Sequence, residues 1–128
     1  MTARIQNSGL ANLTAAWAAY TSLPKYLQWG TSSGAAATAN VVTTTSTTEA
    51  RTTGTVTTVT TTVTNDTYQV VGTITAAGTR AITEVGVFDA AGTGSPPTGG
   101  NMDVYGDFST INLSSGDSIT FTVQVKFS

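Results

Sequence analysis

The side chains best suited to chemistry in this chain of 128 residues are carboxylates, because histidine and cysteine are both absent. Their absence excludes a thiolate nucleophile, a thiolate metal site and a serine triad built on histidine. Asp103 and Asp107 flank a Val-Tyr-Gly segment and could form an acid–base pair or supply oxygen ligands to Ca²⁺. On an extended strand they share a face but lie well apart, so we expect solvated charges at a strand edge. We predict no metal and no cofactor.

Glu84 stands inside the apolar run 82–88, where a carboxylate is costly unless it is paired. It could be a catalytic acid, or one half of a structural ion pair with Arg51 or Arg80. No second catalytic group accompanies it in the sequence, so we predict the structural ion pair. Glu49 and Arg51 lie two residues apart and indicate a similar polar clasp. We therefore do not expect the chain to be an enzyme.

Four aromatic residues, Trp17, Tyr20, Tyr26 and Trp29, are concentrated in the first quarter of the chain. Such rings can form a platform for sugars or a stack for nucleobases, but the lack of interleaved basic residues disfavours nucleic acid. We predict instead that they anchor a helix on the sheet or on a neighbouring subunit, as an assembly interface. The glycine-rich stretch 92–100 has no following Lys-Ser/Thr motif, so it is interpreted as a surface loop.

Charge is scarce in this sequence. Charged residues make up 9% of the chain and the formal net charge is −2, whereas about a quarter of the residues are charged in ordinary soluble domains. So few cations disfavour nucleic acid and anionic membranes as partners. A threonine-rich, weakly charged surface tolerates close contact with neighbours. The first residues lack a continuous apolar segment like that of a secretory signal, so we expect synthesis in a cytoplasm.

Residues 1–24 are predicted to form a polar leader and one short helix. The helix is expected over residues 10–20, where Leu10, Leu13, Trp17 and Tyr20 recur at steps of three and four on one face. Ser8 is the expected N-cap, and Pro24 ends the segment.

Residues 25–128 are predicted to form a single β domain. The expected strands span residues 25–30, 49–63, 67–75, 80–89, 102–108 and 119–127, with turn signals between them. The last strand shows the clearest period-two alternation, and 49–63 with 67–75 is expected to form a hairpin around Asn65 and Asp66. Residues 31–48 contain few large apolar groups and are interpreted as a flexible Thr/Ala-rich arm. The predicted fold class is all-β, a β-sandwich or jelly-roll-like barrel with one short N-terminal helix.

Four stretches of the sequence resemble a group of small virion proteins of tailed bacteriophages. They are residues 26–31 (Tyr-Leu-Gln-Trp-Gly-Thr), 49–51 (Glu-Ala-Arg), 82–89 (Ile-Thr-Glu-Val-Gly-Val-Phe-Asp) and 108–125, which contains Gly-Asp-Ser before the closing strand. The resemblance covers most of the chain from Tyr26 onward, but stretch 31–48 is not part of it. It implies a structural virion protein, either a capsid decoration (cement) protein or a tail or fibre component.

The resemblance leads us to expect a homo-oligomeric capsid decoration protein on the outside of the virion. Its partners would be the major capsid protein and copies of itself, and neither nucleic acid nor a membrane would be bound. A tail, baseplate or fibre subunit is the alternative within the structural class. A carbohydrate-binding module that uses Trp17, Tyr26 and Trp29 is the alternative from another class.

Overall fold

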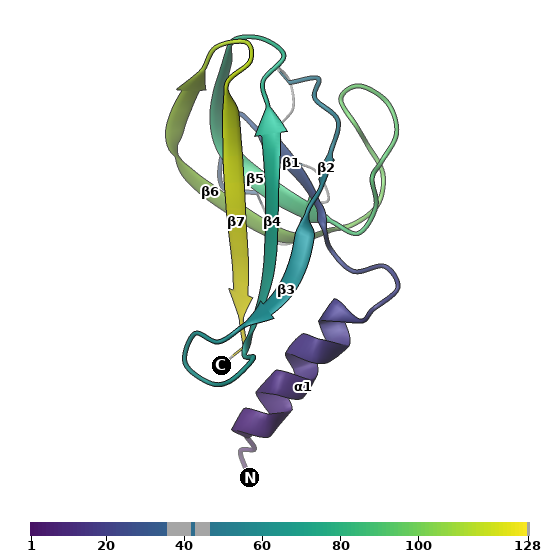
Figure 1. Ribbon diagram of the computed structural model, residues 1–128, viewed down its shortest axis with the longest axis vertical. Coiled ribbons are helices and arrows are strands. Elements are labelled where there is room, and N and C mark those ends of the chain that lie inside the picture. Colours follow the sequence, from purple (N-terminus) through teal and green to yellow (C-terminus); the bar gives the residue numbers. More distant parts are fainter. Residues whose placement is uncertain (36–41, 43–46, 128) are drawn as a thin grey trace.

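The fold is an all-β sandwich of two antiparallel sheets with a short N-terminal helix, as the sequence predicts (Figure 1). The computed structural model describes residues 1–35, 42 and 47–127. The helix is α1 (Asn7–Ala18), and the strands are β1 (Tyr26–Gly30), β2 (Thr52–Thr53), β3 (Thr55–Val59), β4 (Thr67–Thr75), β5 (Arg80–Phe88), β6 (Met102–Leu113) and β7 (Ser118–Lys126). One sheet has the order β2-β1-β5-β6 and the other the order β3-β4-β7.

The hydrophobic core lies between the two sheets. Alternate residues of β4 point into it, and Tyr68, Val70 and Ile74 are buried as their period-two spacing predicts. Leu27 of β1 is fully buried and packs against Gly54 and Gly72, where an added Cβ would come within 2.8 Å and 2.6 Å of its side chain. These two glycines therefore let the sheets approach closely at that point.

Strand β5 lies inside its sheet between β1 and β6 and is buried along most of its length. Its continuous apolar sequence is typical of a strand that is covered on both faces. Strand β6 continues to Leu113, five residues beyond the predicted end. The segment 109–112 has no apolar alternation, and only its pairing with β5 makes it extended.

The predicted strand over residues 49–63 is broken in the structure. Only β2 and β3 are extended, and the chain from 60 to 66 forms a loop. Asp66 organises this loop by accepting hydrogen bonds from the backbone N–H groups of Thr61, Thr62 and Val63. The predicted hairpin with 67–75 is confirmed, since β3 pairs with β4.

Helix α1 lies against β3 and β4 (Figure 1). Its N-cap is Gln6 and no side chain caps it, so the prediction of Ser8 as N-cap is wrong. The inward residues are Leu10 and Thr14, and the Thr14 hydroxyl is satisfied by the carbonyl of Leu10 at 3.1 Å. Leu13 is 42% exposed, so the buried face is rotated from the predicted one.

The described parts of the stretch 31–48 contact the sandwich. The Thr83 hydroxyl donates to the carbonyl of Ser32, and the N–H of Gly34 donates to Asp107 Oδ2 at 2.9 Å. Val42 and Thr47 are buried. The flexible arm predicted for 31–48 otherwise falls on residues 36–41 and 43–46, which lie outside the described residues.

Candidate assembly surface

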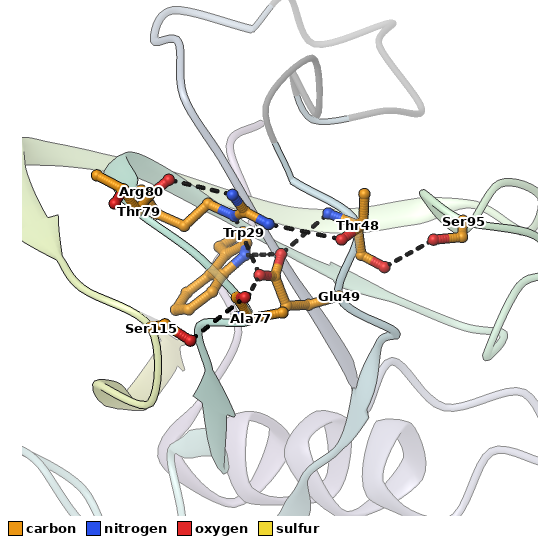
Figure 2. A network of polar contacts seen from close by, with 8 residues as sticks. All are labelled: Trp29, Thr48, Glu49, Ala77, Thr79, Arg80, Ser95 and Ser115. Carbon is orange, nitrogen blue, oxygen red and sulfur yellow. Dashed lines mark hydrogen bonds and ion pairs between the residues drawn. The ribbon is translucent and has the colours of Figure 1, made fainter.

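Glu49 is the centre of a polar network that joins three separate segments of the chain (Figure 2). Its Oε1 accepts hydrogen bonds from Arg80 Nε at 3.0 Å and from the N–H of Ala77 at 2.9 Å. Its Oε2 accepts from Trp29 Nε1 at 3.2 Å and from the N–H of Thr48 at 3.0 Å. Four donors thus fill both oxygens, which leaves this carboxylate a structural role.

Burial of Glu49, whose side chain is 7% exposed, would raise the pKa of its carboxyl. Hydrogen bonds from Ala77, Trp29 and Thr48 outweigh that effect and hold the pKa below its usual range. Arg80 completes an ion pair with Glu49. The sequence prediction paired Glu84 with Arg51 or Arg80 and grouped Glu49 with Arg51, whereas among the described residues Arg80 pairs with Glu49.

Arg51 donates its hydrogen bonds to carbonyl and amide oxygens and not to a carboxylate. Its Nη1 donates to the carbonyls of Ala90 and Gly99 at 2.8 Å each, and its Nε donates to Gln28 Oε1 at 2.8 Å. The guanidinium also lies 3.6 Å from the ring centroid of Phe88. Burial lowers the pKa of Arg51, and nearby Asp89 opposes this. Arg51 therefore holds both ends of the loop that follows β5.

Glu84 is buried on β5 and is 1% exposed. Its Oε2 accepts a hydrogen bond from the hydroxyl of Tyr105 at 2.9 Å, on the neighbouring strand β6. Desolvation, followed by the contact with Glu84, raises the pKa of Tyr105. The predicted ion pair of Glu84 with Arg51 or Arg80 is replaced by this bond because both arginines bind other groups.

The predicted aromatic interface divides into two parts. Trp29 is 1% exposed and belongs to the core, so neither an interface nor a sugar platform can use its ring. Tyr26 is half-buried in β1, with Lys25 Nζ 5.5 Å from its ring centroid. Trp17 stacks on Tyr68 with ring centroids 4.6 Å apart, which anchors α1 on the sandwich as predicted. Tyr20 is 58% exposed.

Trp17 and Tyr20 do share one surface feature, which we call the apolar hollow. It is an open depression of about 400 Å³ between α1 and the end of β7, lined by Leu13, Ala16, Trp17, Tyr20 and Phe127. Residues 5–24 contain no charged side chain. The sequence did not single out Leu13, Ala16 or Phe127 as residues of a surface site. Leu13 belongs to the predicted helix face, and Phe127 ends the alternating strand.

A second surface, neutral except for Lys126 at one end, is the outer side of the three-stranded sheet, which we call the Thr/Gln face. Cross-strand side-chain hydrogen bonds on it join Thr73 to Thr120, Thr75 to Ser118, Gln69 to Gln124 and Gln69 to Thr57. The outward Thr and Gln side chains were predicted from the alternation, but their pairing depends on the register of β4 and β7.

In the described residues, no group of three or more acidic side chains could hold a metal ion. Within the same residues, no helix has the length and apolar character needed to cross a membrane. Comparison of the chain with protein-family models, with curated proteins and with solved structures finds no match.

Proposed function

We propose that this chain is a structural virion subunit, a capsid decoration protein that binds the assembled shell of a tailed bacteriophage. The observation that carries the proposal is the apolar hollow, where Leu13 and Tyr20 expose 42% and 58% of their surface within the uncharged segment 5–24. Exposed apolar groups gathered in one place are typical of a contact surface. The resemblance of residues 26–31, 49–51, 82–89 and 108–125 to phage virion proteins supports the choice of partner.

The distribution of charge supports the same proposal. Glu49 and Arg80 neutralise each other, and Arg51 is committed to the loop after β5. The apolar hollow itself is lined only by uncharged side chains. A neutral, apolar contact suits a protein that must be packed in many copies on one particle without mutual repulsion.

In this proposal the chain acts by binding and not by catalysis. Each copy buries the hollow and its rim across a joint between shell subunits, and several weak contacts on one particle add through avidity. Because the joint exists only in the assembled shell, binding stabilises that state by mass action.

Co-sedimentation with purified empty shells, built from the major capsid protein encoded in the same genome, tests the proposal. We expect the chain to pellet with shells and not with unassembled capsid subunits. The double substitution Leu13→Ser and Tyr20→Ser should weaken binding about tenfold or more, since about 1.4 kcal/mol of apolar contact is lost. Ile111→Ser is the matched control, because Ile111 is 39% exposed and lies outside the hollow.

Failure of the chain to pellet with shells would reject capsid decoration. Labelled chain found on the tail of intact particles would replace it with the tail, baseplate or fibre alternative.

A further inference from the structure

The two sheets end in four edge strands, β2, β6, β3 and β7. Exposed edges invite pairing with other chains unless they are short, irregular, charged or covered. Strand β2 has two residues, and β3 has five residues and contacts α1. Strand β6 shifts register twice against β5 and carries the exposed carboxylates Asp103 and Asp107. Three of the four edges are therefore protected.

Strand β7 has none of these protections. It pairs with β4 in one unbroken register over nine residues, from Ser118 opposite Thr75 to Lys126 opposite Thr67. It contains no proline, and its one charged residue, Lys126, is the last. In the described part of the chain no strand pairs with its other side, and Figure 1 shows β7 with β4 and β3 on one side only.

The hydrogen bonds that continue the β4–β7 ladder fix which residues face the free edge. The N–H of Ala76 donates to the carbonyl of Asp117 at 2.8 Å, and the N–H of Phe127 donates to the carbonyl of Asp66 at 2.9 Å. Hydrogen-bonded pairs alternate along an antiparallel ladder, so the odd-numbered residues of β7 bond to β4. The N–H and C=O groups of Thr120, Thr122 and Gln124 therefore point away from β4, toward solvent.

We propose that β7 pairs antiparallel with β7 of a second copy, about a two-fold axis at Thr122, to form a dimer with a continuous six-stranded sheet. This is the register in which all nine residues of both strands are paired. It places Thr122 opposite itself, Phe121 opposite Val123, Ile119 opposite Val125, Thr120 opposite Gln124 and Ser118 opposite Lys126.

Three features make a second copy the right occupant. The register matches apolar with apolar and polar with polar residues, because the two-fold axis preserves the alternation of the strand. Lys126 faces Ser118, so no like charges meet. The partner strand also lies beside Ile119, Val123 and Val125, which are only half-buried in the single chain. Identical surfaces meet in such an interface, as two-fold dimers require.

Cysteine cross-linking tests the register directly, because the chain has no cysteine of its own. Thr122→Cys should form a disulfide-linked dimer under mild oxidation, since directly opposed residues in a hydrogen-bonded pair lie about 5.5 Å apart between Cα atoms. Thr120→Cys, which would face Gln124 of the partner subunit, should cross-link at least about tenfold less. Thr57→Cys, exposed on the opposite edge of the same sheet, is the control for random collision.

Sedimentation velocity supplies an independent measurement. The unmodified chain should sediment as a dimer, with twice the chain mass of 13.0 kDa. Thr122→Pro should be monomeric with an unchanged circular dichroism spectrum, because it removes only an N–H that faces the free edge. Thr122→Lys should also be monomeric, because two ammonium groups would meet on the axis.

A monomeric unmodified chain, or equal cross-linking of the three cysteine variants, would overturn this inference. Shell binding is measured separately. A monomer that still pellets with shells would reject the strand pairing and leave the proposed function standing, and a dimer that ignores shells would do the reverse.

Discussion

The network around Glu49 and the Thr/Gln face show opposite uses of polar side chains. Around Glu49, charged groups are buried, and each tethers a loop to the sandwich. On the Thr/Gln face, exposed neutral side chains bond only to each other across the strands. The charged side chains of the first region therefore stabilise the interior, whereas the hydrogen-bonded pairs of the Thr/Gln face are neutral.

Asp66 extends the first pattern to the other end of the sandwich. Its carboxylate accepts hydrogen bonds from the backbone of Thr61, Thr62 and Val63 and from the hydroxyls of Thr61 and Thr67. Burial opposes its charge, but these bonds outweigh that effect and hold the pKa of Asp66 well below its usual range.

The largest effect is expected from Glu49→Gln, which keeps the shape of the side chain but replaces one acceptor oxygen with a donor. Two of the four present donors then lose their acceptor, and Arg80 loses its counter-charge. We expect the free energy of unfolding, measured by urea denaturation, to fall by about 3 kcal/mol.

The control for that change is Asp107→Asn. Asp107 is exposed and is bonded to the N–H of Gly34. Its replacement should cost less than about 1 kcal/mol. Equal losses in the two variants would show that the interior network has no special weight, and the contrast between the two regions would fail.

Arg51→Lys should be the next most damaging change. The lysine keeps the charge but cannot reach the carbonyls of Ala90 and Gly99 together, nor stack its flat group on Phe88. We expect a loss of about 2 kcal/mol in urea denaturation and faster proteolysis within 89–101. Arg4→Lys, at an exposed position, should stay within about 0.5 kcal/mol of the unmodified chain. A stable Arg51→Lys protein would deny that this arginine holds the loop.

Lowering the pH should weaken the buried carboxylate networks and leave the neutral hydrogen bonds of the Thr/Gln face unchanged. The pKa values of Glu49 and Asp66 are depressed in the folded chain, so their stabilisation is complete above the ordinary carboxyl pKa of about 4. It is lost as the pH falls below that value, because the unfolded chain then binds more protons. Asp66→Asn should therefore show a flatter decline of unfolding free energy below about pH 4. Parallel curves for the two proteins would contradict the role of Asp66.

The smallest effect is expected on the Thr/Gln face itself. Thr73→Val removes the hydroxyl that bonds to Thr120. Both positions are exposed, so the Thr120 hydroxyl can bond to water instead. Valine also suits an extended backbone. Urea denaturation should detect a change within about 0.5 kcal/mol. A loss comparable to that of Glu49→Gln would mean that this face, too, is needed for folding.

Most of the sandwich was predictable from the sequence because its strands alternate locally. The pattern at 67–75 and 119–127 follows from side-chain period alone, and both strands are confirmed. The strand end at Leu113 and the break of 49–63 were not predictable, because they depend on pairing with β5 and on the carboxylate of Asp66. Strand β5 is distant in sequence, and the bonds of Asp66 to residues three to five positions before it form only when the chain turns over 60–66.

The candidate site was predicted only in part. Trp17 anchors the helix as expected, but Trp29, which is equally large and aromatic, is buried. Composition cannot separate the two, because burial depends on where each residue lies in the fold, Trp17 on helix α1 and Trp29 on strand β1. The ion-pair prediction offered Arg51 or Arg80 as the partner of Glu84, whereas Arg80 pairs with Glu49, which lies just before β2.

The salt dependence of shell binding tests the central claim most directly, that this chain acts through an uncharged surface. The affinity for purified empty shells is measured by co-sedimentation at two salt concentrations. Between about 50 mM and about 500 mM salt, we expect the Kd to change by less than about twofold, because screening has no charge pair to weaken. A steep loss of affinity with salt, or no binding at either concentration, would contradict the account.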